Sequence, residues 1–284
     1  MRKVSAVIVT FNNASMLKGL LEDLEGQSRP PDEILVVDNA SVDGTRDLVT
    51  KSFPEVTYLR LPENTGSAGG YHEGMKAALA QSDLIWTLDD DVRLERDSLE
   101  MLIRGFEEMD ARLPIGAVRS VGERLPGRTR PTRLALFPWR GTLIKSEAVR
   151  RHGLPLKEFF IYGEDLEYAM RFNAAGLPCY WIPSSVCTER RLEGKSDYRL
   201  LGSTVRVYSS AFQLYYAFRN NVFVFVTYRD LHRLVRTLLY ALKASLGILL
   251  FEGTSGFRKL GAIVKGILHG LTGRLGKNPA YLPG

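Results

Sequence analysis

The chain has 284 residues, 45% hydrophobic and 25% charged, which allows one or two folded domains with a full core and excludes a disordered chain. Its two cysteines, Cys179 and Cys187, form no Cys-x-x-Cys pair, so a disulfide framework and a cysteine zinc site are excluded and a reducing compartment is expected. The net charge of +6 is unevenly distributed along the chain. Residues 219–284 hold ten Lys/Arg and two Asp/Glu, a net charge of +8, so residues 1–218 carry a net charge of −2. This basic segment predicts an anionic partner surface, either membrane or nucleic acid.

Strands and helices alternate through the first part of the chain. The N-terminal apolar run is short and followed by Asn12 and Asn13, which indicates a strand rather than a signal peptide. Ser15 is the expected cap of the first helix. The predicted strands are Val4–Thr10, Glu33–Asp38, Val56–Leu61 and Leu84–Leu88; helices are predicted after Ser15, at Gly44–Phe53, after the Asn64–Gly70 loop to about Ala80, and at Asp97–Met109. This order predicts an α/β fold with a mainly parallel sheet and helices on both faces.

The middle of the chain is less regular. Gly122–Arg133 is rich in Arg, Pro and Gly and is predicted to be a mobile loop, and the polar segment Arg190–Ser210 is also predicted to be a loop. Between them we predict strands at Trp139–Lys145 and Cys179–Ile182, a helix at Ser146–His152, and a helix from Gly163-Glu164-Asp165 to about Ala175.

The last third is predicted to be helical. Leucines and valines recur at helical spacing from Leu231 to Leu250, while His232, Arg233, Arg236 and Lys243 argue against a transmembrane segment. This basic leucine stripe is expected to pack on the rest of the chain, to mediate oligomers or to lie on a membrane. The second apolar stretch, Leu260–Leu271, is short and rich in glycine, so it is not expected to span a bilayer.

Polar residues follow all four predicted strands of the first part. Ligands of parallel α/β sheets lie outside the carboxyl ends of the strands, so these groups should converge. They are Thr10-Phe11-Asn12-Asn13, Asp38-Asn39-Ala40-Ser41, Asn64-Thr65-Gly66-Ser67-Ala68-Gly69-Gly70 and Asp89-Asp90-Asp91.

The triple aspartate is the most informative of these groups. Three adjacent carboxylates at the end of a buried strand repel one another and require a counter-charge, for which a divalent cation holding phosphate oxygens is one explanation. An acidic turn or helix cap is the equal alternative from this run alone. Asp38 can accept hydrogen bonds from a ribose or base, and the Asn64–Gly70 loop can bring backbone N–H groups near an anion.

Together these features predict a nucleotide-diphosphate site with Mg²⁺ or Mn²⁺ held by Asp89 or Asp91. The chain has no G-x-x-x-x-G-K-[ST] sequence and no G-x-G-x-x-G after the first strand, which disfavours kinases, P-loop ATPases and ordinary dehydrogenases.

The order of these motifs resembles that of the family 2 glycosyltransferases, which have the GT-A fold. The resemblance covers roughly residues 4–190 and is closest to bacterial rhamnosyl- and galactofuranosyltransferases of cell-envelope polysaccharides. It rests on Val7-Ile8-Val9-Thr10-Phe11-Asn12, Val36-Val37-Asp38-Asn39-Ala40-Ser41-Val42-Asp43-Gly44-Thr45, Asn64-Thr65-Gly66, Asp89-Asp90-Asp91 and Gly163-Glu164-Asp165-Leu166-Glu167-Tyr168 followed by Arg171.

The resemblance implies a role for each matching position. Thr10, Asn12 and Asp38 would contact the donor nucleoside, Asp89 and Asp91 would form the D-x-D pair on ribose and metal, and Asp165 would be the general base beside Glu164. The expected nucleotide-sugar site is completed by Asn39, Asn64, Gly66, Gly69 and Asp90. Relatives often carry a metal-binding histidine after the next strand. This chain has none there, so Glu189 is the predicted substitute ligand, with Arg190 or Arg191 as an alternative neutraliser of the diphosphate.

Two residues have two possible roles each. Trp139 and Arg140, before Gly141, either line the acceptor site or are a core tryptophan and a surface arginine; the two interpretations are equally weighted. Residues 1–210 are expected to form the catalytic domain and residues 211–284 a helical, basic amphipathic region.

The resemblance implies an inverting transferase that moves a sugar, rhamnose or galactofuranose, from a dTDP- or UDP-linked donor to a hydroxyl of a lipid-linked or polysaccharide acceptor. It implies a cytoplasmic enzyme on the inner face of an anionic membrane, with no nucleic acid partner and with homo-oligomers as a further option. A sugar nucleotidyltransferase and a non-catalytic membrane-surface protein of the same fold are the alternatives. The first normally needs an early glycine-rich loop with Arg and Lys, which Asn12-Asn13-Ala14-Ser15 lacks.

Overall fold

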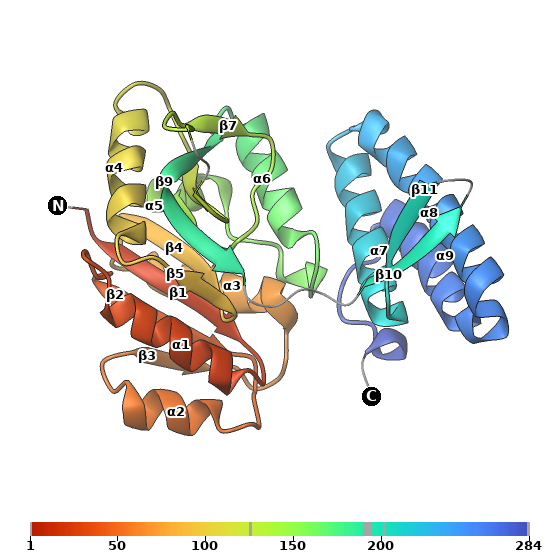
Figure 1. Ribbon diagram of the computed structural model, residues 1–284, viewed down its shortest axis with the longest axis horizontal. Helices are drawn as coiled ribbons and strands as arrows, with labels where there is room; N and C mark the ends of the chain where they lie inside the picture. Colours follow the sequence, from red (N-terminus) through yellow and green to blue (C-terminus); the bar gives the residue numbers. More distant parts are fainter. Residues whose placement is uncertain (1, 125–126, 190–194, 201–202, 283–284) are drawn as a thin grey trace. The chain divides into compact units, whose positions relative to one another are not determined.

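The computed structural model describes residues 2–124, 127–189, 195–200 and 203–282. The chain divides into two compact units (Figure 1). The first consists of Met1–Lys157 and Asp165–Arg191, and the second of Glu158–Glu164 and Leu192–Gly284. The short segment 158–164 therefore belongs with the C-terminal helices, although it interrupts the first unit in sequence. The catalytic domain of residues 1–210 stays a prediction.

Nine strands of the described chain form one sheet, which lies in the first unit. Its order is β3-β2-β1-β4-β8-β6-β9-β5, with β7 paired to β9. The strands are β1 (Val4–Thr10), β2 (Glu33–Asp38), β3 (Thr57–Arg60), β4 (Leu84–Asp89), β5 (Val92–Leu94), β6 (Ala117–Val121), β7 (Thr132–Leu134), β8 (Thr142–Lys145) and β9 (Cys179–Glu189).

The part of the sheet that carries the predicted site is parallel. β1 pairs in parallel with β2 and β4, and β2 pairs in parallel with β3. The registers place Thr10 opposite Asp38 and Val9 opposite Asp89, so three predicted strand ends meet at one edge. Strand β8 then joins antiparallel to β4 and β6, and β6 returns to a parallel pairing with β9. The predicted α/β architecture is confirmed.

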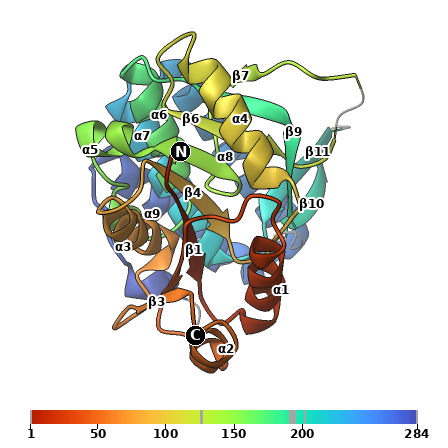
Figure 2. The ribbon, with the colours of Figure 1, turned by 90° about the vertical axis from the view of Figure 1, so that its left-hand side faces the viewer.

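Successive apolar side chains of β1 point to opposite faces of the sheet, and helices cover both faces. Val4, Ala6 and Ile8 pack into a core with helices on one face, and Val7 packs into a separate core on the opposite face. Figure 2 shows α1 and α4 on one side of the sheet and α3 on the other. Strands buried on both faces are continuously apolar, as this one is. The helices are α1 (Ala14–Glu25), α2 (Thr45–Ser52), α3 (Gly66–Ala78), α4 (Ser98–Asp110), α5 (Ser146–His152) and α6 (Glu164–Ala174).

Several local expectations need correction. Asn13, not Ser15, stands at the N-cap of α1, so the proposed cap lies inside the helix. The Arg190–Ser210 segment is not a loop throughout, because β10 (Lys195–Leu200) and β11 (Ser203–Tyr208) pair as an antiparallel hairpin. Sequence reasoning missed this hairpin because most of the segment is polar, although Val205 and Val207 alternate with polar residues and are buried with Tyr198 in the core of the second unit.

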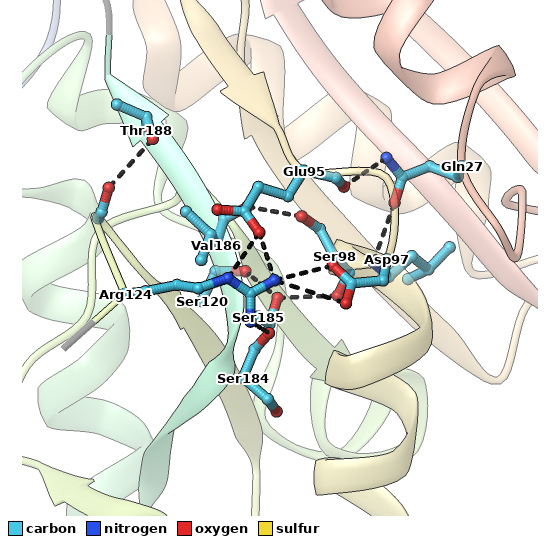
Figure 3. A network of polar contacts seen from close by, with 12 residues as sticks. Gln27, Glu95, Asp97, Ser98, Ser120, Arg124, Ser184, Ser185, Val186 and Thr188 are labelled. Atoms are coloured by element: carbon cyan, nitrogen blue, oxygen red, sulfur yellow. Dashed lines mark hydrogen bonds and ion pairs between the residues drawn. The ribbon is translucent and has the colours of Figure 1, made fainter. Parts of the chain in front are cut away.

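The predicted loop Gly122–Arg133 is tied down at its start and ends in β7. Arg124 Nε donates a 2.8 Å hydrogen bond to Oε2 of Glu95, and its guanidinium also pairs with Asp97 (Figure 3). Nearby, Ser98 donates a 2.6 Å bond to the carbonyl of Val186, and Ser185 returns a 2.8 Å bond to the carbonyl of Ser98. This network holds the start of α4 on a bulged part of β9, where Val121 pairs with Val186.

The second unit contains the β10–β11 hairpin and three helices, α7 (Ala211–Thr227), α8 (Leu231–Glu252) and α9 (Phe257–Leu271). Its core includes Tyr215, Tyr216 and Phe218 of α7 and small residues of α8, among them Ala241 and Ala244. The glycines of α9 allow close packing on α7, because a Cβ at Gly270 would lie 2.5 Å from the carbonyl oxygen of Arg219.

The composition of α8 and α9 bears on the expectation that charged residues argue against a transmembrane segment. In the described residues, the helical region Leu231–Leu271, made of α8, a 3₁₀ turn and α9, is long and apolar enough to cross a membrane by length and composition, with a mean hydropathy of 1.7 in its most apolar 18-residue window. Only 22% of its most apolar window is buried. Between Arg236 and Arg258 only Lys243 and Glu252 are charged, which explains the result. Length and composition alone do not distinguish spanning from lying on a surface.

Candidate active site

The triple aspartate begins at the last residue of β4. Asp89 lies on the same side of the strand as Ile85 and Thr87, the side covered by α3. There the hydroxyl of Tyr71 donates a 2.7 Å hydrogen bond to its Oδ1. Burial raises the pKa of Asp89 to about 7, against the hydrogen bond from Tyr71, and the charges of Asp91 and Asp90 raise it further. A cation at this position would relieve this repulsion.

Asp90 connects the ends of β1 and β4. Its Oδ2 accepts a 2.6 Å bond from Thr10 Oγ1 and its Oδ1 a 2.7 Å bond from Asn13 Nδ2. Burial raises the pKa of Asp90 to about 6, and these two hydrogen bonds oppose the rise. Thr10, predicted to contact the nucleoside, is buried and directed at Asp90, so the structure gives it a role in holding the strand ends together.

Asp38 and Asn39 organise the neighbouring loops. Asp38 is fully buried and receives hydrogen bonds from Tyr58, from Arg60 Nη1 at 2.7 Å and from the Ser41 amide at 2.8 Å. Asn39 accepts bonds from the Thr65 amide and hydroxyl at 3.2 and 3.0 Å and donates to the Gly66 carbonyl. Both predicted donor-binding side chains thus brace the surface on which a nucleoside would rest.

The two loops after β1 and β2 also hold each other. The Asn12 amide donates to Ser41 Oγ at 2.9 Å, and Asn12 Oδ1 accepts from the Val42 amide at 2.8 Å. Asn12 and Ala40 both have positive φ angles, 50° and 62°, which non-glycine residues adopt at an energetic cost. Strained backbone at two adjacent strand ends is typical of a functional edge.

The glycine-rich segment is largely helix, not loop. Asn64 Oδ1 accepts a 2.8 Å bond from the Gly66 amide, and α3 begins at Gly66. A Cβ on Gly69 would lie 2.3 Å from Thr65 Oγ1, and one on Gly70 would lie 2.4 Å from Val9 Cγ1. These glycines therefore permit the helix to approach β1 closely. The helix N-terminus faces the same edge, where amide groups favour an anion.

Asp165 lies in the first turn of α6, where its Oδ1 accepts a 2.7 Å bond from the Leu166 amide. Burial raises the pKa of Asp165, while the positive charges of Arg140 and Arg119 act to lower it. Arg140 also lowers the pKa of Asp89. The preceding Glu164 is 4% exposed and belongs with the second unit, so the acidic pair spans the junction between the two units in sequence.

The segment before Glu164 is strained and tightly held. Phe160 and Tyr162 have φ angles of 66° and 64°, and Gly163 has 82°. Asn220 of α7 donates from Nδ2 to the carbonyls of Phe159, Ile161 and Tyr162 at 3.1, 2.9 and 2.6 Å. Buried Arg219 adds a 2.6 Å bond to the Phe159 carbonyl. Several hydrogen bonds to one short segment can hold its backbone in a strained conformation.

Glu189, the predicted metal ligand, is brought beside the triple aspartate. It pairs in register with Val92, the residue after Asp91. Its carboxylate, however, makes a 2.5 Å ion pair with Arg140. Across the described ranges, no group of three or more His, Cys, Asp or Glu side chains is arranged to hold a metal ion. Arg190 and Arg191 lie outside the described residues.

The donor chemistry nevertheless suits a hard cation. Mg²⁺ in nucleotide enzymes is usually held by one or two carboxylates together with substrate phosphates and water. Asp89 and Asp91 supply two such carboxylates, and their mutual repulsion is the observation that a bound cation would explain. Asp89 and Asp91 are therefore enough protein ligands for Mg²⁺ when substrate phosphates and water complete its coordination.

The three residues predicted on the acceptor side, Trp139, Arg140 and Gly141, have different surroundings in the structure. Trp139 is 3% exposed and packs at 4.9 Å from the ring of Tyr71 and 5.3 Å from that of Tyr168, as a core residue. Gly141 has a φ of 68°, and a Cβ added to it would lie 2.8 Å from Cys187 Cβ, so a side chain has no room. Arg140 is half-buried and lies among the carboxylates described above.

Two residues escaped sequence reasoning. Tyr71 follows the glycine pair on α3 and anchors Asp89. Arg119 lies inside β6, 6% exposed, and burial lowers the pKa of its guanidinium. A lone arginine in the short apolar strand Ala117–Val121 was the available signal, since arginine is rarely buried unless it faces negative charge.

Comparison with known proteins identifies the family. The model of the family "Glycosyl transferase family 2" matches residues 5–164, more than half of the chain, so the chain belongs to this glycosyltransferase family. Galactofuranosyltransferase GlfT1 of Mycolicibacterium smegmatis is 30% identical over 62% of this chain and 67% of its own length. Its counterpart in Mycobacterium tuberculosis is also 30% identical, over 62% of this chain and 66% of its own length. The matched part thus spans about two thirds of the length of each of these two relatives.

Solved structures agree on the fold. TarS 1–349 of S. aureus, in complex with UDP-GlcNAc, superposes with a TM-score of 0.63 at 16% identity, covering 93% of this chain and 81% of that one. The mannosyltransferase PcManGT of Pyrobaculum calidifontis, in complex with GDP-Man and Mn²⁺, gives 0.60 at 17% identity, covering 95% and 87%. The GT-A fold and the enzyme class predicted from sequence are confirmed.

Proposed function

We propose that this chain is an inverting, metal-assisted transferase that moves galactofuranose, or alternatively rhamnose, from a UDP- or dTDP-linked donor to a hydroxyl of a lipid-linked or polysaccharide acceptor. The galactofuranosyltransferase relatives support the first sugar. Nucleotide-sugar complexes of proteins with the same fold support the donor class.

One observation carries the proposal. The charge of Arg140 opposes the rise in pKa that burial causes at both Asp89 and Asp165, and its guanidinium pairs with Glu189 beside the triple aspartate. Two carboxyl groups from distant parts of the sequence thus experience the charge of the same arginine side chain. A donor diphosphate near Asp89 and an attacking hydroxyl near Asp165 fit this arrangement, because the two reacting groups must meet at one anomeric carbon.

In the proposed step Asp165 accepts the proton of the acceptor hydroxyl while that oxygen bonds to the anomeric carbon. The bond from this carbon to the diphosphate oxygen breaks, and the configuration inverts. Burial raises the pKa of Asp165 towards the range in which a carboxylate is an effective base at neutral pH. Arg140 is positioned to offset the negative charge that develops on the diphosphate.

Asp89 and Asp91 would hold Mg²⁺ or Mn²⁺. When bound, the cation supplies Lewis-acid stabilisation of the leaving diphosphate. Glu189 as a further ligand would have to give up its ion pair with Arg140, so we assign it a lesser role. Asn64, Gly66 and Gly69 support the edge through which the phosphates would enter.

The location proposed is the cytoplasmic, inner face of an anionic membrane, with no nucleic acid partner. Helix α8 supports it, because one face packs in the protein core while Leu231, Leu242 and Leu250 are 68%, 68% and 63% exposed on the rest of the surface. An apolar helix surface left uncovered fits a lipid environment. Homo-oligomers are the alternative way to cover it.

The deciding experiment measures sugar transfer from UDP-galactofuranose and dTDP-rhamnose to a synthetic lipid-linked acceptor. We expect Asp165→Asn to lower turnover by about 10²–10⁴-fold while UDP still stabilises the protein against heat in the presence of Mn²⁺. Full turnover by this variant would refute the assignment of the base. Release of inorganic diphosphate from a nucleoside triphosphate and a sugar phosphate would instead identify a nucleotidyltransferase. Vesicle binding without turnover for any donor would favour the non-catalytic alternative.

A further inference from the structure

A cavity of about 420 Å³ opens in the second unit. Its lining comes from α7, the first half of α8 and the end of β11, so it lies within one unit. The walls are mainly apolar and aromatic, with Phe218, Phe225 and Tyr240 among them. The rings of Phe218 and Tyr240 are stacked with their centroids 5.8 Å apart, so α7 and α8 contact each other at this wall.

Two arginines add positive charge to these apolar walls. Arg233 and Arg236 lie three residues apart on α8, hence on one side of the helix, and both line the cavity. Arg233 forms a 2.8 Å ion pair with Asp230 at the helix cap. Arg236 makes no ion pair with any residue that the structure describes, and the described lining contains no Asp or Glu. The cavity therefore offers a free guanidinium beside apolar surface.

Uncovered apolar side chains continue from this cavity along the helices. Of the sixteen exposed large apolar side chains in the described residues, fourteen lie in α7, α8 and α9. On α8, the exposed Val235 precedes Arg236 in sequence and the exposed Leu239 lies on the next turn of the helix. A purely apolar ligand would leave the exposed guanidinium of Arg236 without a partner, and a small anion would leave the aromatic walls unused. The combination fits an amphiphile with an anionic head.

We propose that this cavity binds the phosphate head of a long-chain lipid phosphate, whose chain lies along the exposed apolar face of α8. A guanidinium offers several donors in a planar fork that matches phosphate oxygens. We assign the lipid to the lipid-linked acceptor rather than to bulk phospholipid, because a bilayer surface can be held by a flat apolar face and needs no cavity. The inference rests on the proposed function for the identity of the acceptor.

The test uses n-decyl phosphate, below its micelle concentration, titrated into the full chain by calorimetry. We expect saturable binding that Arg236→Gln weakens at least fivefold. Lys243→Gln removes the same charge from an exposed position on α8 outside the lining and should change binding less than twofold. Thr237→Phe, which fills the cavity without changing charge, should also weaken binding at least fivefold.

Three results would overturn the proposal: equal weakening by Lys243→Gln, equally tight binding of inorganic phosphate, or equally tight binding of neutral decyl maltoside. A second arm separates the two lipid sources. We expect Arg236→Gln to raise the KM for the lipid-linked acceptor at least fivefold while it and Lys243→Gln reduce binding to phosphatidylglycerol vesicles equally. Selective loss of vesicle binding in Arg236→Gln would assign the cavity to bulk phospholipid and refute the acceptor assignment.

The calorimetric arm does not depend on turnover. If no donor supports transfer, the proposed function fails, yet decyl phosphate binding and its dependence on Arg236 still decide whether the cavity is a lipid-phosphate site. Heat stability with UDP serves as the folding control for every variant.

Discussion

The hydroxyl of Tyr71 donates a 2.7 Å hydrogen bond to Oδ1 of Asp89, and so connects helix α3 to the first carboxylate of the triple aspartate. This bond favours the charged form of Asp89 against the burial that raises its pKa to about 7. Helix α3 can reach the strand because Gly70 and Gly74 carry no side chain against Val9 and Val7. The glycine-rich sequence thus serves the electrostatics of the site through packing.

Removal of this hydrogen bond should weaken cation binding near neutral pH. In Tyr71→Phe the pKa of Asp89 rises further, so a larger fraction of the carboxyl is protonated at pH 7. We expect the Mn²⁺-dependent stabilisation by UDP to decrease at pH 7 and to recover at pH 8.5. The measurement is the melting temperature with UDP and Mn²⁺ across this pH range. Equal stabilisation of the variant and the natural protein at both pH values would contradict the role of Tyr71.

The stability of the ligand-free protein should fall as pH rises through the range in which Asp89 titrates. Its pKa is about 7 in the folded protein and about 4 in an unfolded chain, so the folded state binds more protons between these values. Stability from this group is therefore greatest at low pH and is lost towards pH 7. Asp89→Asn, which still accepts the bond from Tyr71, should be about 1–3 kcal/mol more stable than the natural protein at pH 8.

The check is chemical denaturation at pH 5 and pH 8, without metal or nucleotide. Asp47→Asn, on an exposed ion pair of α2, is the matched control and should leave the stability and its pH dependence nearly unchanged. If Asp89→Asn shows the same pH dependence as the natural protein, the carboxyl does not titrate in this range.

The charge of Arg119 should set the pH at which the proposed base becomes active. This charge lowers the pKa of Asp165, so Arg119→Met is expected to move the acidic limb of the turnover profile to higher pH. Arg119→Lys keeps the charge and should leave the limb nearer its original position. The measurement is kcat against pH for both variants. Identical profiles for the Met and Lys variants would show that the charge of Arg119 does not act on the base.

Asn220 is expected to act as a positioning residue for the acidic pair. Its amide holds three carbonyls of the strained segment before Glu164, so Asn220→Ala should lower kcat by at least tenfold while leaving the UDP-dependent stabilisation in place. Asn173→Ala removes an amide that likewise bonds two carbonyls, on the far end of α6, and should leave kcat within twofold. A parallel loss of UDP-dependent stabilisation in Asn220→Ala would indicate unfolding instead of mispositioning.

Membrane association should depend on the uncovered leucines of α8. The double substitution Leu242→Gln and Leu250→Gln removes two side chains that are 68% and 63% exposed, which are worth about 1.5–3 kcal/mol each when buried in an apolar phase. We expect vesicle binding to fall more than tenfold with little change in melting temperature. Val42→Gln, at an 86% exposed position of the first unit, is the control. Unchanged vesicle binding would contradict the membrane assignment and leave oligomers as the partner of this face.

Sequence patterns determined the parallel half of the sheet and the position of its polar edge. Apolar strands of four to seven residues and helices with leucine stripes have strong local periodicity, and parallel pairing then requires their polar ends to meet. Asp89, Asp90 and Asp91 were therefore identifiable, as was the Glu164-Asp165 motif through its family resemblance.

Tertiary structure decided which side chains surround these carboxylates. Arg119 and Arg140 act on Asp89 or Asp165 because β4, β8 and β6 lie together in the sheet, an order that their separation along the chain does not encode. Tyr71 reaches Asp89 because α3 packs closely on β1. The β10–β11 hairpin and the arginine-lined cavity of α8 also depend on long-range packing. Local periodicity reports which face of an element is apolar, whereas the charge that a buried group feels depends on every element packed around it.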